Sequence, residues 1–149
     1  MKLVICEKPS VGAAVAAALG VTGRKDGYIE GNGYLISWCI GHLVQLSEAA
    51  AYGEQYKKWS YDSLPILPQE WQYTVAADKG KQFKILKDLM HSADVSEVVN
   101  ACDAGREGEL IFRFVYHQAG CKPSLPPITS SQRERIKSDF SARGLSSSL

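Results

Sequence analysis

Four charged side chains are crowded among alanine and glycine in residues 103–109. They are Asp103, Arg106, Glu107 and Glu109. Carboxylate oxygens are hard ligands that suit Mg²⁺, and a guanidinium group can hold two phosphate oxygens at once. The alternative is purely structural, because an Asp at a helix N-cap and carboxylates in the first turn are favoured without any ligand. This acidic loop by itself leaves both interpretations open.

A second charged pair, Glu7 and Lys8, follows the apolar run 2–6, just as Asp103 follows the apolar run 98–102. If both runs are strands of one parallel sheet, their carboxyl ends meet at the edge where such folds place ligands. Lys8 would then hold phosphate as a point charge. Crowding by other carboxylates favours a protonated Glu7, which makes it the candidate general acid. The combined set predicts metal-assisted phosphoryl transfer on a polynucleotide.

The elements that must position these residues alternate between strand-like and helix-like segments. Predicted strands are 2–6, 72–76, 98–102 and 128–129, and predicted helices are 11–19, 80–91, the acidic loop to about 119, and 132–143. Ser10 is the expected N-cap of the first helix. Residues 28–40 predict a hairpin, and 47–71 a long turn-rich excursion that Trp59 and Trp71 are expected to pin to the body. The alternation predicts a parallel sheet covered by helices on both faces.

The composition narrows the class of protein. At 149 residues with 45% apolar and 22% charged content, one ordinary globular domain is expected. A net charge of +1 argues against whole-chain attraction to nucleic acid, so phosphate contacts must come from local clusters. No apolar run suits a membrane span or a secretion signal, and no GxxxxGK[ST] or GxGxxG motif supports ATP or a dinucleotide. The cysteines (Cys6, Cys39, Cys102, Cys121) lack CxxC spacing, which disfavours zinc or a disulfide framework.

Several stretches carry a family resemblance when they are taken together. They are LVICEKPS (3–10), GHLVQL (41–46), YKKW (56–59) with LPILP (64–68), and NACDAGREGELIFR (100–113). In this order and spacing the chain resembles the TOPRIM domain of bacterial type IA DNA topoisomerases, most closely the topoisomerase III branch. The resemblance covers a core of residues 1–122 within a single domain 1–149, and residues 123–149 match loosely. It implies a Rossmann-like α/β sheet of about four parallel strands flanked by helices, with a hairpin and a long loop insertion.

The resemblance also implies roles for individual residues. Glu7 matches the family's catalytic glutamate, which handles the proton at the leaving ribose oxygen, and Lys8 matches the lysine that contacts the scissile phosphate. Asp103 and Glu107 match the first and last acids of the DxDxE motif that binds Mg²⁺. We expect Glu7 as a further metal ligand and Arg106 as the last member of the catalytic set.

This sequence departs from the family pattern in two ways. The middle acid of DxDxE is Gly105 here, which puts a second-ion site in doubt and leaves Glu109 as a possible substitute. The family's nucleophilic tyrosine lies in a separate downstream domain. None of the tyrosines present matches it, namely Tyr28, Tyr34, Tyr52, Tyr56, Tyr61, Tyr73 and Tyr116.

The resemblance therefore implies the N-terminal part of an ATP-independent isomerase that relaxes negatively supercoiled DNA or decatenates it. The expected partners are DNA, mainly its single-stranded regions, and the remaining domains of a parent chain in the nucleoid-containing cytoplasm of a bacterium. This part alone is predicted to be inactive. Two alternatives stay open: a stand-alone TOPRIM nuclease or primase-like protein, and a non-catalytic module that binds phosphate or nucleic acid.

Overall fold

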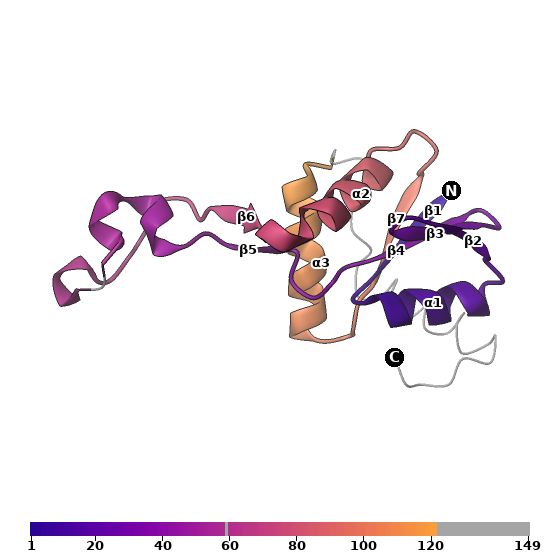
Figure 1. The fold of residues 1–149 in the computed structure, drawn as a ribbon, viewed down its shortest axis with the longest axis horizontal. Coiled ribbons are helices and arrows are strands. Elements are labelled where there is room, and N and C mark those ends of the chain that lie inside the picture. The colour runs from indigo at the N-terminus through magenta and orange to yellow at the C-terminus, as the bar shows by residue number, and fades with distance from the viewer. Residues whose placement is uncertain (59, 122–149) are drawn as a thin grey trace.

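A five-stranded mixed sheet with strand order β2-β3-β4-β1-β7 organises the fold (Figure 1). The computed structural model describes residues 1–58 and 60–121. The strands are β1 (Lys2–Cys6), β2 (Gly23–Lys25), β3 (Tyr28–Gly31), β4 (Tyr34–Trp38) and β7 (Glu97–Ala101). Strands β4, β1 and β7 are parallel, whereas β3 and β2 extend the sheet antiparallel. The predicted α/β architecture is confirmed. The described residues form three parallel strands, where about four were expected. The predicted strand 128–129 and helix 132–143 lie outside the described residues.

The three parallel strands end at the same level. Cys6 at the end of β1 pairs with Trp38 of β4 and with Ala101 of β7. Strand β1 lies between β4 and β7, and its residues 3–6 are buried, as expected for a parallel strand covered on both faces. The segments that follow β1, β4 and β7 therefore leave the sheet side by side at one edge.

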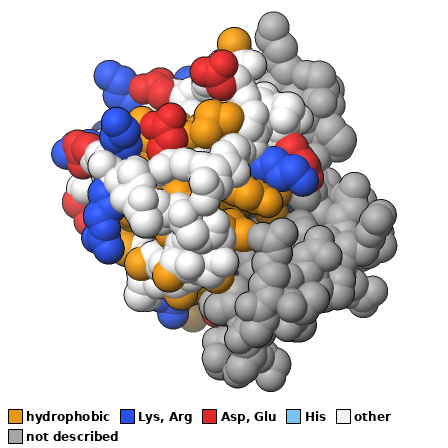
Figure 2. Space-filling model, turned by 90° about the vertical axis from the view of Figure 1, so that its right-hand side faces the viewer, with side chains coloured by type: hydrophobic (Ala, Val, Ile, Leu, Met, Phe, Trp, Pro, Cys, Tyr) orange, Lys and Arg blue, Asp and Glu red, His pale blue; other side chains and the backbone are white. Residues whose placement is uncertain are grey.

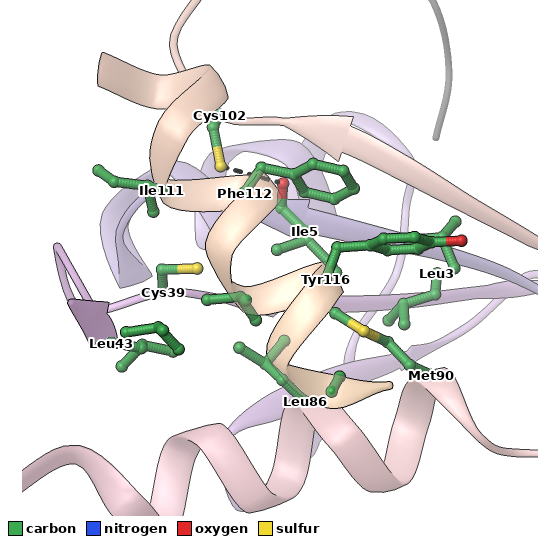
Figure 3. Close-up of a cluster of buried hydrophobic side chains, with 14 of the residues drawn as sticks. Leu3, Ile5, Cys39, Leu43, Leu86, Met90, Cys102, Ile111, Phe112 and Tyr116 are labelled. Atoms are coloured by element: carbon green, nitrogen blue, oxygen red, sulfur yellow. Dashed lines mark hydrogen bonds between the residues drawn. The ribbon is translucent and has the colours of Figure 1, made fainter. Parts of the chain in front are cut away.

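Helices cover the two faces of the sheet. Helix α1 (Pro9–Ala18) packs against one face, where Val4 and Cys6 of β1 meet Val15. Helices α2 (Gly80–Met90) and α3 (Arg106–Ala119) cover the other face (Figure 3). The hydrophobic cluster between this face and the two helices includes Leu3, Ile5, Leu86, Phe112 and Val115, all fully buried. Alternate residues of β1 thus supply the two halves of the core.

The start of α1 differs from the prediction. The helix begins at Pro9, and an extended Lys8 occupies the N-cap position instead of Ser10. Proline suits the first helical position because its missing N–H has no intrahelical partner there. At Gly12 an added Cβ would lie 2.7 Å from Cε3 of Trp38, so this glycine lets the helix lie close against β4.

The predicted hairpin is confirmed as β3 and β4, which turn through Gly31, Asn32 and Gly33. Asn32 has a φ of 49° and donates from Nδ2 to the Gly20 carbonyl at 2.8 Å, which ties the turn to the end of α1. The edge strand β2 was not predicted. Figure 2 shows the side of the molecule that lies on the right in Figure 1. On this face, positive and negative side chains are interspersed around apolar ones.

A projecting arm occupies residues 47–72, between the short antiparallel strands β5 (Val44–Leu46) and β6 (Tyr73–Val75). It extends away from the sheet (Figure 1), and its described residues form three 3₁₀ turns, Ala49–Tyr52, Glu54–Tyr56 and Tyr61–Ser63. Trp71 was expected to pin this segment to the body. Instead its ring packs edge-on against Tyr52 within the arm, with centroids 6.1 Å apart, while Trp59 lies outside the described residues. No helix in the described part of the chain is long and apolar enough to cross a membrane.

Candidate functional site

The acidic loop links the end of β7 to the first turn of α3. Helix α3 begins at Arg106, and Gly105 occupies its N-cap position without a side-chain cap. Asp103 therefore does not cap the helix, which removes one structural explanation for this residue. Glu107 and Glu109 lie in the first turn, as predicted, where the helix dipole favours carboxylates.

Gly108 fixes how closely the helix approaches this loop. An added Cβ at Gly108 would lie 2.2 Å from the carbonyl oxygen of Asp103 and 2.8 Å from its nitrogen. The same carbonyl accepts a 2.7 Å hydrogen bond from the N–H of Gly105. The backbone of Asp103 is thus packed directly against the first turn of α3. The sequence-based prediction treated Gly108 only as one of the small residues in 103–109 and gave it no such role.

Glu7 and Asp103 lie together, as the sheet-edge argument predicted. The N–H of Asp103 donates to Oε2 of Glu7 at 3.4 Å, so residues far apart in the sequence meet beyond the ends of β1 and β7. Glu7 is half-buried, whereas the side chains of Lys8, Asp103 and Arg106 are exposed. Lys8 and Arg106 are close to these carboxylates in the sequence, and exposed cations there suit an anionic ligand that approaches from solvent.

Glu107 contacts a residue to which the sequence analysis gave no role. Its Oε1 is paired with Nε2 of His42, in the segment between β4 and β5. The carbonyl of His42 in turn accepts a 3.1 Å hydrogen bond from Nζ of Lys79. The available signal was the position of His42 shortly after β4, because this segment leaves the sheet at the same edge as Glu7 and Asp103.

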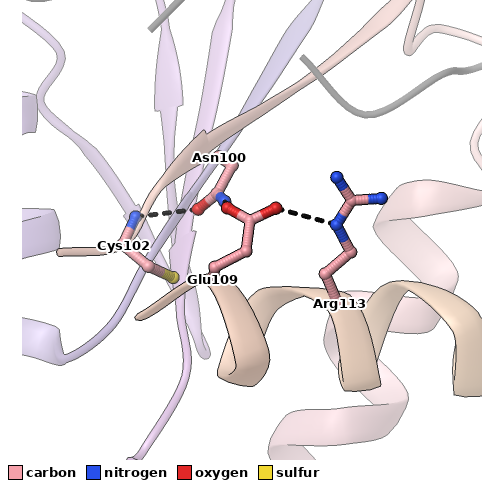
Figure 4. Close-up of polar contacts among 4 residues, drawn as sticks. All are labelled: Asn100, Cys102, Glu109 and Arg113. Carbon is pink, nitrogen blue, oxygen red and sulfur yellow. Dashed lines mark hydrogen bonds and ion pairs between the residues drawn. The ribbon is translucent and has the colours of Figure 1, made fainter. Parts of the chain in front are cut away.

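Glu109 is engaged elsewhere (Figure 4). Its Oε1 accepts a 2.7 Å bond from Nε of Arg113, and its Oε2 accepts a 3.3 Å bond from Nδ2 of Asn100. Asn100 is buried on β7, and its Oδ1 accepts the N–H of Cys102 at 3.0 Å. Both carboxylate oxygens of Glu109 therefore have protein partners, an arrangement that ties α3 to β7.

The predicted metal ligands offer the right donor chemistry without a closed cage. Asp103, Glu107 and Glu7 supply the hard oxygens that Mg²⁺ prefers. Within residues 1–58 and 60–121, however, no three or more His, Cys, Asp or Glu side chains are grouped to hold a metal. Mg²⁺ is commonly held by one or two carboxylates together with water and phosphate, so Asp103 and Glu107 fit an open site of that kind.

Three cysteines lie at or just after the carboxyl ends of the parallel strands: Cys6, Cys39 and Cys102. All three are buried free thiols. Burial raises the pKa of Cys6 to about 12, with a further contribution from Cys102. Cys6 therefore stays neutral at physiological pH and adds no negative charge below the carboxylates.

The chain aligns over most of its length with relatives among known proteins. It is 43% identical over 141 residues to a DNA topoisomerase 3 of Shouchella clausii (strain KSM-K16), and 39% identical over 140 residues to one of Staphylococcus epidermidis (strain ATCC 12228 / FDA PCI 1200). A DNA topoisomerase 3 of Bacillus anthracis is 43% identical over 140 residues. Each match covers 93% of this chain but only 19–20% of the relative, so the chain spans about one fifth of their length. The Toprim domain family model matches residues 2–137, and the chain accordingly belongs to the Toprim domain family.

Proposed function

We propose that this chain is the Toprim part of a type IA DNA topoisomerase of the topoisomerase 3 kind. The parent enzyme would break and rejoin one DNA strand without ATP, and so relax negative supercoils or decatenate DNA. The observation that carries the proposal is the contact between Glu7 and the N–H of Asp103, because it joins the two motifs that the family resemblance assigns to one site. Relatives named DNA topoisomerase 3 support the same assignment.

The proposed roles follow from charge and position. Asp103 and Glu107, with Glu7 as a further candidate, would hold Mg²⁺, which when bound neutralises charge on the phosphate. Lys8 and Arg106 would contact the phosphate oxygens, Lys8 as a point charge and Arg106 as a fork. In the state in which it is protonated and not bound to the metal, Glu7 would give its proton to the ribose oxygen that leaves when the strand is broken, and take it back on rejoining.

The attacking tyrosine would come from a domain beyond this chain, so residues 1–149, proposed to form one domain with a core of 1–122, would be inactive alone. The proposed partners are DNA, mainly single-stranded regions, and the other domains of the parent protein. Because the proposed substrate is DNA, the parent enzyme is proposed to lie at the nucleoid in a bacterial cytoplasm.

Relaxation of negatively supercoiled plasmid with Mg²⁺ tests this proposal. The full parent chain should relax the plasmid, Glu7→Gln should lower its rate by at least about 100-fold, as expected for loss of a general acid, and Glu30→Gln should leave it unchanged. The 149-residue chain should show no relaxation. Metal-dependent nicking by the short chain, lost in Asp103→Asn, would instead identify a stand-alone nuclease. DNA or phosphate binding that needs no Mg²⁺ and survives Asp103→Asn would identify a binding module.

A further inference from the structure

The side chain of Glu107 is paired with one neighbour, His42. Its side chain is 70% exposed on the first turn of α3, and the side chain of His42, with which it is paired, is 36% exposed. An exposed glutamate otherwise samples several rotamers, and fixing it in one costs conformational entropy when a ligand binds. A donor already in place beside one oxygen reduces that cost.

His42 is itself held firmly, although it lies in a connection between strands. The next residue, Leu43, is fully buried in the core cluster on the α2 and α3 side. The preceding Gly41 has a φ of 60°, a left-handed conformation that glycine adopts without strain. Lys79, just before α2, donates to the His42 carbonyl. The backbone of His42 is therefore anchored by the buried Leu43 and by the hydrogen bond from Lys79 to its carbonyl.

The hydrogen bond from His42 leaves half of the Glu107 carboxylate for other partners. An ionised carboxylate has about four lone-pair sites on two oxygens. Nε2 of His42 takes a site on Oε1, and Oε2 stays available to a metal ion or to water on that ion. Ring N–H groups and other donors around metal-binding carboxylates commonly orient them in this way.

We propose that His42 is a positioning residue, which donates an N–H to Oε1 of Glu107 and so presents Oε2 for metal binding. The inference rests on the proposed function, because it assumes that Glu107 is a Mg²⁺ ligand. His42 precedes β5 and Lys79 follows β6, so both ends of the strand pair that bears the arm meet at this support.

A MgCl₂ titration of the 149-residue chain, followed by NMR of the Asp103 and Gly105 amides, tests the inference. His42→Ala should raise the Kd for Mg²⁺ about tenfold, the lower end of the effects seen for such supporting residues. His42→Gln keeps an N–H at a similar reach and should stay near the wild-type Kd. His117→Ala, on the exposed far end of α3, is the control and should change nothing. In a Glu107→Gln background, His42→Ala should add no further loss.

The outcomes separate this inference from the proposed function. An unchanged or lower Kd in His42→Ala, beside a raised Kd in Glu107→Gln, overturns the positioning role and leaves the metal site standing. Equal weakening in His42→Ala and His42→Gln overturns the role of the N–H donor. If the wild-type chain does not respond to Mg²⁺ at all, the proposed metal site fails and the inference fails with it.

Discussion

The sheet edge and the arm place exposed side chains in opposite ways. At the carboxyl ends of the parallel strands, Asp103 and Arg106 have exposed side chains. Their backbone follows a buried strand, and that of Asp103 packs against the first turn of α3. In the arm, the three 3₁₀ turns bury no residue, and Tyr61 and Leu67 are 96% and 78% exposed. A rigid frame can hold reacting groups in one geometry, whereas a segment with few buried contacts opens at low free-energy cost.

The arm is stabilised mainly by contacts within itself. The N–H of Gln72 donates to the Tyr52 hydroxyl at 3.0 Å, and residues of the arm line a pocket of about 430 Å³. At its base, the ring of Tyr73 packs on Phe114 of α3 with centroids 4.7 Å apart. Its base is thus joined to the core, and substitutions farther out should leave the site intact.

The same substitution in the two regions should give the largest contrast. Leu3→Ala removes a fully buried side chain from the interior strand β1, and we expect the free energy of unfolding to fall by about 2–5 kcal/mol. Leu67→Ala in the arm should change it by less than about 0.5 kcal/mol. Urea denaturation followed by circular dichroism measures both. A large loss in Leu67→Ala would mean that the arm is part of the cooperative core.

Two glycines of the acidic loop provide a sharper comparison within the site. Gly108→Ala places a methyl group against the Asp103 backbone and should cost about 1–3 kcal/mol of stability as the helix shifts. It should also displace Asp103 from Glu7 and weaken Mg²⁺ binding. Gly105→Ala is the control, because its φ is −140° and a Cβ there meets nothing within 4 Å. If both variants bind Mg²⁺ like the wild type, the packing of Gly108 against Asp103 does not hold the site in its geometry.

The buried Asn100 of β7 contacts both Cys102 and Glu109, and its replacement should have an intermediate effect on stability. Asn100→Ala leaves the N–H of Cys102 without its side-chain acceptor and removes a donor to Glu109. We expect about 1–3 kcal/mol of lost stability, because the variant loses two hydrogen bonds of a buried side chain. Ser96→Ala, just before the same strand, removes an exposed hydroxyl contact and should be nearly neutral. Equal thermal melting temperatures for the two variants would contradict the role given to Asn100.

The sequence predicted the parts of this molecule that depend on regular patterns. Apolar runs identified the strands that carry Glu7 and Asp103, and the geometry of parallel strands predicted that these two residues meet. The start of α1 was misplaced because Ser10 is a common cap, while Pro9 satisfies the first turn by its own geometry. Local propensity could not reveal this choice, since both residues are typical of helix starts.

Contacts between distant polar residues could not be predicted in the same way. His42 pairs with Glu107, and Asn100 pairs with Glu109. Both contacts depend on the directions of side chains near the ends of the parallel strands, and the pattern of apolar and polar residues does not predict those directions. The pairing of β5 with β6 was also missed, because these strands are short and lie on either side of the long arm. Closing such a loop depends on packing at its base, which the sequence of the arm does not report.

The pair of Arg113 with Glu109 should show the smallest effect. The side chains are 43% and 33% exposed and lie at i and i+4 of α3, where such pairs contribute about 0.3–0.5 kcal/mol. Arg113→Met keeps the apolar stem and should lower stability by about that amount at low salt, and by less at 0.5 M NaCl because salt screens the pair. Lys57→Met is the matched control, since it breaks the exposed pair with Glu54 in the arm. If Arg113→Met also weakened Mg²⁺ binding while Lys57→Met did not, the link from α3 through Glu109 to β7 would be part of the frame that holds the site, and the frame would extend farther along the helix than its first turn.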